Sequence, residues 1–118
     1  MTKAQQVRSR RLESIQNELT EEAKKVFDSI LDLIDADTKK GHYGTIEVCL
    51  FYDQYELKTT GYCNKVYDLS TILHKFDRQQ FFTILKEVVE QEEGFKAVIK
   101  TDATVWDSKA IVFQVVVE

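Results

Sequence analysis

The chain has 118 residues, of which 43% are hydrophobic and 31% are charged, and its formal net charge is −4. This length predicts a single domain over residues 1–118 with a core of its own. The absence of proline and the four glycines argue against a low-complexity or linker-rich chain. Because the sequence has neither an 18-residue apolar run nor an apolar N-terminal stretch, we expect a cytoplasmic protein without a membrane span.

The charge is unevenly distributed. Residues 1–11 contain four basic and no acidic side chains, whereas residues 12–118 contain 12 basic and 20 acidic ones. The sequence therefore predicts a basic N-terminal arm on an acidic body, either frayed in solvent or in contact with phosphate or an acidic partner. The basic residues of the arm are Lys3, Arg8, Arg10 and Arg11.

Apolar residues at spacings of three and four predict helix over residues 4–38. The stripe consists of Leu12, Ile15, Leu19, Ala23, Val26, Phe27, Ile30 and Ile34. Thr20, followed by Glu21 and Glu22, has the character of a helix start. The segment is therefore either one long helix or two helices with a break near Thr20.

Alternation of apolar and polar residues predicts a first hairpin over residues 45–60, with a turn at Asp53-Gln54 and with Leu50 opposite Leu57. Further along the chain, Asp68 is a candidate cap for a short helical turn. Asp77, with Gln80 three residues later, predicts the start of a helix that ends at Gly94.

A second hairpin is predicted over residues 95–117, with a turn at Asp107-Ser108. Its last strand is apolar on both faces, with Val112 and Val116 on one face and Ile111, Phe113, Val115 and Val117 on the other. The second apolar face needs a cover, from the N-terminal helix or from a second copy. We therefore expect a homodimer formed through the C-terminal strand or the N-terminal helix.

The elements combine into an α+β fold of order α-β-β-α-β-β. We expect a four-stranded antiparallel sheet with helices packed mainly on one face.

An acidic row follows the predicted first helix opposite its apolar stripe. Glu21, Lys25, Asp28, Asp32 and Asp35 step by 4, 3, 4 and 3 residues. Such a row is either a solvated helix face or a surface for a basic partner, and like charges at this spacing destabilise a helix slightly.

Tyrosines cluster in and beside the first hairpin, where Tyr52, Tyr55 and Tyr62 are candidate partner contacts. Residues 43–67 are not basic, so a protein partner fits this segment better than single-stranded nucleic acid.

Catalytic candidates are few. His42 and His74 are the only histidines, and neither lies in a nucleophile motif. Cys49 and Cys63 lack disulfide-framework and metal-ligand spacing, and Cys49 reads as a small structural hydrophobe. We predict no catalytic residue, no cofactor and no metal.

The sequence favours a non-enzymatic protein-binding module, a small inhibitor, adaptor or regulator of the kind that phages or mobile elements encode. Its surfaces are the acidic helix face and the tyrosine-rich hairpin, and its partner has a basic surface. Two alternatives remain: a nucleic-acid-associated protein that uses the basic arm, which the acidic body disfavours, and an enzyme whose site assembles from scattered histidines and carboxylates.

Overall fold

The computed structural model describes residues 2–52, 54–73 and 76–118. The elements are α1 (Lys3–Lys39), β1 (Ile46–Phe51), β2 (Glu56–Thr59), β3 (Val66–Asp68), α2 (Ser70–Leu73), α3 (Arg78–Gln91), β4 (Phe95–Val105) and β5 (Ser108–Val117). The fold is α+β with an antiparallel sheet, as expected. The sheet has five strands rather than four, so the order α-β-β-β-α-α-β-β replaces the expected one.

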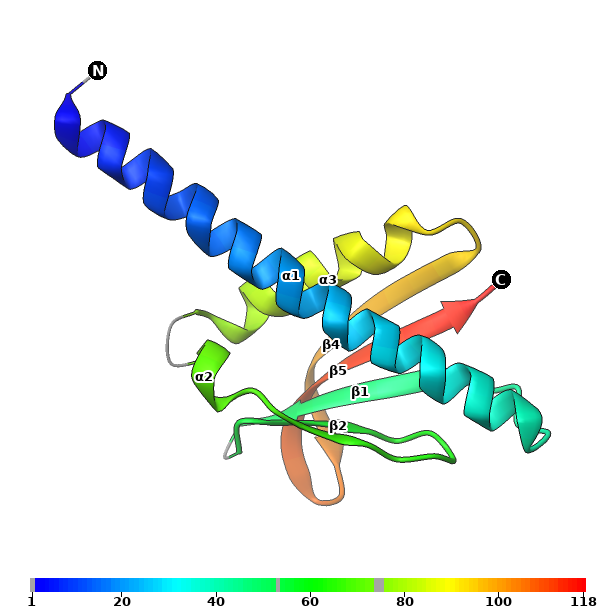
Figure 1. Ribbon diagram of the computed structural model, residues 1–118. Coiled ribbons are helices and arrows are strands. Elements are labelled where there is room, and N and C mark those ends of the chain that lie inside the picture. The colour runs from blue at the N-terminus through cyan, green and yellow to red at the C-terminus, as the bar shows by residue number, and fades with distance from the viewer. Residues whose placement is uncertain (1, 53, 74–75) are drawn as a thin grey trace.

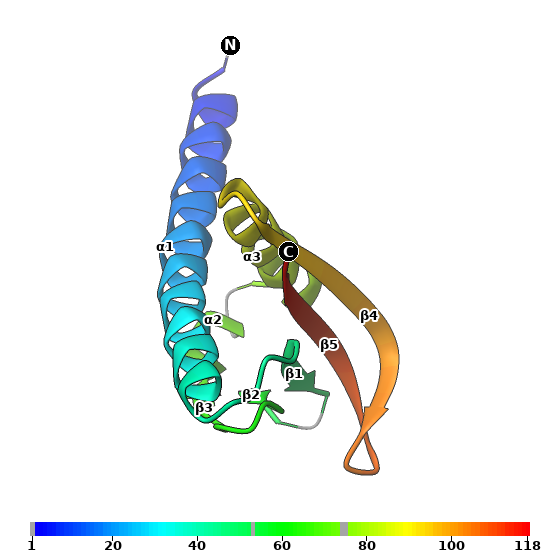
Figure 2. The same cartoon turned by 90° about the vertical axis from the view of Figure 1, so that its right-hand side faces the viewer.

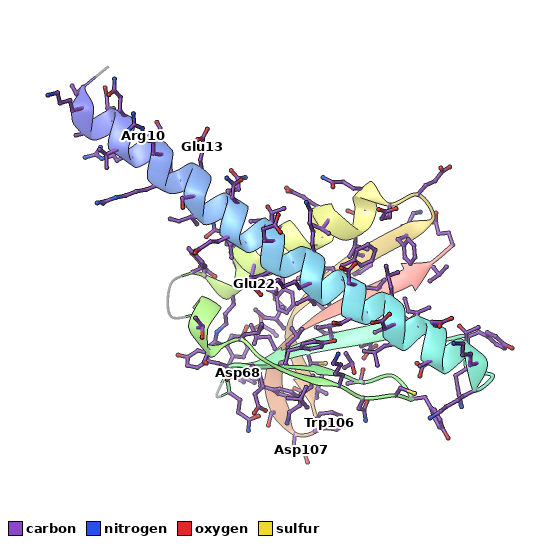
Figure 3. The ribbon with its side chains drawn as sticks, in the orientation of Figure 1. Arg10, Glu13, Glu22, Asp68, Trp106 and Asp107 are labelled. Atoms are coloured by element: carbon purple, nitrogen blue, oxygen red, sulfur yellow. The ribbon has the colours of Figure 1, made fainter. Side chains whose placement is uncertain are left out.

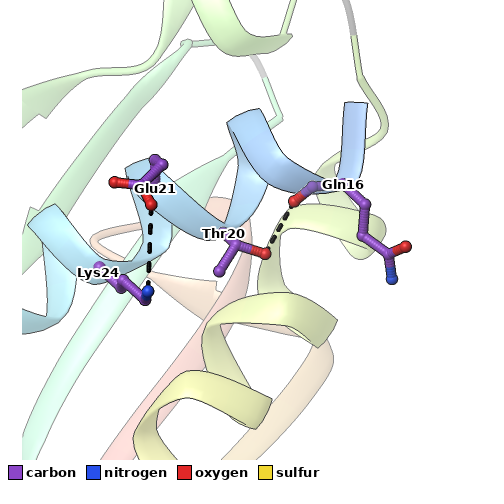
Figure 4. A network of polar contacts seen from close by, with 4 residues as sticks. All are labelled: Gln16, Thr20, Glu21 and Lys24. Carbon is purple, nitrogen blue, oxygen red and sulfur yellow. Dashed lines mark hydrogen bonds and ion pairs between the residues drawn. The ribbon is translucent and has the colours of Figure 1, made fainter. Parts of the chain in front are cut away.

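Helix α1 is unbroken, which decides between the two alternatives for residues 4–38. Thr20 does not begin a new helix, because its hydroxyl donates to the carbonyl of Gln16 at 2.8 Å inside the same helix (Figure 4). The helix begins in a capping box, in which the Thr2 hydroxyl accepts from the Gln5 amide and the Gln5 side chain accepts from the Thr2 amide. In this structure the basic segment is the capped start of α1.

The two halves of α1 lie in different surroundings (Figure 1). Residues 2–14 are all exposed, and the N-terminal half projects beyond the body of the molecule. Burial begins at Leu19 and continues through Leu33 on the face that meets the sheet and α3. The molecule is consequently elongated, with extents of 58 × 33 × 20 Å.

The sheet has the strand order β3-β2-β1-β5-β4, with every pair antiparallel. The expected register of the first hairpin is confirmed, since Leu50 pairs with Leu57 and Val48 with Thr59. The expected turn at Asp53-Gln54 lies partly outside the described residues, because Asp53 is not among them. The fifth strand, β3, pairs with β2 and was not predicted, because it is three residues long and has no apolar alternation.

Both predicted caps after the first hairpin are present. The carboxylate of Asp68 accepts from the Ser70 amide at 2.9 Å where α2 begins. The carboxylate of Asp77 accepts from the Gln79 amide at 2.8 Å and caps α3. Gly94, with a φ of 90°, follows the end of α3 and allows the chain to reverse into β4.

Helices α1 and α3 lie on the same side of the curved sheet (Figure 2). The main core fills the space between them and includes Ile111, Phe113 and Val115 of β5. The other side of the sheet carries a smaller cluster of Cys49, Phe51, Ala110 and Val112, packed against Ala103 and Val105 from the long β4–β5 hairpin.

These two clusters correct the reason given above for a second copy at the C-terminal strand. Ile111, Val112, Phe113 and Val115 are buried within one chain, on both faces of β5, whereas Val116 is half-buried and Val117 is exposed. The hairpin achieves this by an irregularity between Lys100 and Ala103, where the register shifts and Asp102 adopts a φ of 58°. A bulge of this kind bends the strand, so the hairpin can cover its own outer face.

The turn of the second hairpin lies one residue earlier than predicted. Val105 pairs with Ser108, so the turn residues are Trp106 and Asp107, with φ angles of 51° and 61°. Two residues with positive φ match the right-handed twist of the flanking strands. The sequence signal was hidden because neither residue is glycine or asparagine.

Candidate functional site

The outer face of α1 carries a row of exposed charged residues. Glu21, Asp28, Asp32 and Asp35 are all exposed on it, opposite the buried stripe. Glu21 lies 4.0 Å from the Lys24 amine (Figure 4), and Asp35 lies 3.1 Å from that of Lys39. Asp28 and Asp32 form no salt bridge with a described residue. The acidic row predicted from the sequence therefore stands in solvent on a helix whose opposite face is fixed in the core.

An open groove of about 530 Å³ runs beside the N-terminal half of α1, where α1 leaves the body. Its residues from α1 are Arg10, Glu13, Ser14, Asn17, Glu18, Glu21 and Glu22, and Thr71 and Phe76 come from the segment around α2. Arg10 and Glu13 lie on the projecting half of α1, and Glu22 lies where the helix reaches the body (Figure 3). Four glutamates and one arginine make this groove acidic.

The four basic residues of the arm are distributed around α1. At 100° per residue, Arg8 and Arg10 point to nearly opposite sides of the helix. Lys3 lies in the first turn of α1, where the positive end of the helix dipole disfavours a cation and no acidic residue offsets it. Arg8, Arg10 and Lys3 thus do not form one face that would track a phosphate backbone.

The three candidate tyrosines do not form one surface. Tyr52 and Tyr55 flank the β1–β2 connection, where the Arg78 guanidinium lies 5.1 Å and 5.6 Å from their ring centroids. Arg78 also donates to the Tyr52 carbonyl at 3.0 Å. Tyr62 follows β2 at the other end of the hairpin, so the structure divides the tyrosine-rich hairpin into two separate patches.

The Tyr62 patch is a corner held together by a buried carboxylate. The ring of Tyr62 stacks on His42 at 3.9 Å. Nearby, Asp37 is buried at the end of α1 and accepts from the Cys63 amide at 2.9 Å. A Cβ on Gly61 would lie 2.8 Å from the Ile46 Cδ1 and 2.9 Å from the Asp37 Oδ2, so a larger residue would force these side chains to shift. Asp37 therefore anchors the loop that carries Tyr62.

Of the scattered candidates for catalysis, His42 and the carboxylate Asp37 line one cavity of about 370 Å³ at the end of α1. His42 stacks on a tyrosine, and His74 lies outside the described residues. Cys49 is buried under the β4–β5 hairpin, as expected of a structural residue. Burial, with a smaller effect from the Glu47 carboxylate, raises the pKa of the Cys49 thiol to about 11, so the thiol is protonated at neutral pH.

Trp106 is a candidate contact that sequence reasoning missed. It is 59% exposed at the tip of the β4–β5 hairpin (Figure 3), and its ring stacks on Phe51 at 5.9 Å. The Lys58 amine lies 5.9 Å from the same ring. An exposed tryptophan in a left-handed backbone conformation is typical of a binding surface. The only signal in the sequence was a lone tryptophan between two strand-like segments.

None of the described helices has the length and apolarity that crossing a membrane requires. Within residues 2–52, 54–73 and 76–118, no three His, Cys, Asp or Glu side chains are grouped as metal ligands would be. Comparison with known proteins finds no family model, no curated protein and no solved structure that matches this chain.

Proposed function

We propose that the chain is a non-enzymatic protein-binding module whose main binding surface is the outer face of α1. The observation that carries this proposal is the exposed acidic row of Glu21, Asp28, Asp32 and Asp35, opposite a face that is buried in the core. A rigid row of negative charge favours a partner with a basic surface, because complementary charge speeds encounter and fixes orientation.

The row has a cost to the helix that its surroundings do not offset. Asp28 and Asp32 are like charges four residues apart, and aspartate is a weak helix former. Neither has a salt bridge with a described residue. A helix selected only for stability would alternate these positions with lysine, so the charge is better explained by binding.

The test uses two variants with the same change in net charge. Asp32→Asn/Asp35→Asn removes two charges from the outer face of α1. Glu87→Gln/Glu93→Gln removes two exposed charges from α3 and its C-terminal end. Proteins captured by the wild type at low salt are identified, and the affinity of each variant for the captured protein is measured.

We expect Asp32→Asn/Asp35→Asn to weaken this complex about tenfold, because each charge pair at an interface rim contributes modestly. The Glu87→Gln/Glu93→Gln variant should bind as the wild type does. A complex that both variants weaken equally, or that neither weakens, would contradict the assignment of this face.

A further inference from the structure

The same face of α1 carries a second pattern, which runs through both halves of the helix. At the heptad spacing of three and four, one line of positions passes through Lys3, Val7, Arg10, Ser14, Asn17, Glu21, Lys24 and Asp28. All of these residues are exposed. The line is basic at Lys3, Arg10 and Lys24, and it is acidic at Glu21 and Asp28. Lys24 lies 4.0 Å from Glu21 of its own chain, and in the arrangement described next it faces Val7.

When the line is read in reverse order, the basic residues Lys3 and Arg10 coincide with the acidic residues Asp28 and Glu21. If two copies of α1 lie antiparallel with Ser14 of one opposite Asn17 of the other, Arg10 meets Glu21 and Lys3 meets Asp28. Each of these pairs occurs twice, because the arrangement has a two-fold axis. The small polar side chains of Ser14 and Asn17 lie at the centre, where the two helices cross.

The fold leaves room for this arrangement. Residues 2–14 of the projecting half are all exposed, with Thr71 and Phe76 of the same chain across the groove from Arg10 and Ser14. The line also lies opposite the buried stripe, so a second helix on it would not collide with the sheet or α3. Arg10, Ser14, Asn17 and Glu21 line one side of the acidic groove, which therefore borders the crossing point.

We propose that two copies of the chain associate through this charge ladder, with their α1 helices antiparallel. The proposal takes up the acidic face of the proposed function and names one ligand for it, the basic half of α1 from a second copy. Asp32 and Asp35 lie outside the ladder, so a foreign basic partner can be tested there separately.

The ladder contains only one apolar residue, Val7, and its ion pairs are exposed. Association should therefore be weak and sensitive to salt. In sedimentation equilibrium at about 300 µM protein and low salt, we expect a dimer that dissociates in about 1 M NaCl, where the Debye length is about 3 Å.

Single substitutions supply a matched pair. Arg10→Glu places two like charges opposite each other in the ladder and should weaken the dimer more than tenfold. Arg8→Glu makes the same chemical change two residues away, on nearly the opposite side of α1, and should leave the dimer intact. Circular dichroism of both variants checks that α1 remains helical.

A charge swap tests the antiparallel arrangement itself. Lys3→Glu/Arg10→Glu and Glu21→Lys/Asp28→Lys should each be monomeric alone, and an equimolar mixture of the two should form a heterodimer. In a parallel pair the wild type would place like residues opposite each other and would not dimerise, so a wild-type dimer together with rescue on mixing is specific to the antiparallel arrangement. A disulfide between Ser14→Cys of one copy and Asn17→Cys of the other, formed on mild oxidation, would support the register.

Three results would overturn the proposal: a wild type that is monomeric at all concentrations, a dimer that Arg8→Glu weakens as much as Arg10→Glu, and charge-swapped variants that do not rescue each other. Low-salt binding of a DNA duplex by a monomeric wild type, lost in Arg10→Glu, would assign the arm to nucleic acid instead. If the wild type is monomeric but binds a foreign partner that Asp32→Asn/Asp35→Asn no longer binds, the proposed function stands and the dimer does not.

Discussion

Leu12 and Leu19 lie on the same face of one helix, seven residues apart, and their surroundings are opposite. Leu19 is completely buried, whereas Leu12 is 64% exposed on the projecting half. The apolar stripe begins at Leu12 and runs into the packed half without a change of pattern, so periodicity alone does not tell where the core to pack against begins. The point at which the apolar stripe becomes exposed therefore marks where α1 leaves the body. The stabilities of variants in the two halves of α1 can be compared directly.

The largest expected effect is on the packed half. Leu19→Ala should lower the free energy of unfolding by about 2–5 kcal/mol, because it removes buried methyl groups and leaves a cavity. Leu12→Ala should change it by less than about 0.5 kcal/mol. Urea unfolding at low micromolar protein, where the copies are separate, measures both values. Equal losses would show that the projecting half is packed against something in solution.

A second pair compares two aspartates at the end of α1. Asp37 is buried and accepts from the Cys63 amide, whereas Asp35 is exposed beside Lys39. Asp37→Ala should cost about 1–3 kcal/mol because it leaves that amide without its acceptor. Asp35→Ala should cost less than about 1 kcal/mol, as expected for a surface ion pair. The same urea measurements give the free energy of unfolding of both variants. If Asp37→Ala is as stable as the wild type, the loop at Gly61 is held by other contacts.

The smallest expected effect is confined to alkaline pH and extends the comparison to the sheet. Burial raises the pKa of the Cys49 thiol from 9.0 to about 11. Between these values the unfolded chain loses the thiol proton and the folded chain keeps it, so stability falls as pH rises from about 9 to about 11. The loss approaches about 3 kcal/mol above pH 11 and is absent at neutral pH. It should be absent from Cys49→Ala and present in Cys63→Ala, measured as the slope of unfolding free energy against pH.

The sequence was sufficient wherever local pattern and packing agree. The register that pairs Leu50 with Leu57 follows from alternation, because a slip of one residue would turn the apolar side chains to the other face. The helical conformation of residues 12–34 also follows from the apolar stripe, whereas the sequence left open whether residues 4–38 form one helix or two. The Asp68 and Asp77 caps were found because short acidic side chains before a helix satisfy its free amides.

The rest depended on tertiary structure. Strand β3 takes its conformation from pairing with β2 and has no periodic pattern of its own. Val112 is buried beside a bulge near Asp102 on the neighbouring strand, where the hairpin bends. No pattern around Val112 in the sequence indicates this bulge. Tyr52, Tyr55 and Tyr62 are close in sequence, but β2 separates Tyr55 from Tyr62 in space. The single tyrosine surface expected from the sequence is therefore two separate patches.

The continuity of α1 has a consequence for valency. In the antiparallel pair, residue 29, in the middle of the packed half, lies opposite residue 2 of the second copy. Residue 29 of the second copy lies about 40 Å further along the helix axis. A pair of unbroken helices would thus hold two bodies at a fixed separation and present Asp32 and Asp35 twice. A basic target with two sites at that spacing would be bound by both bodies at once, at an effective concentration far above that of the free protein.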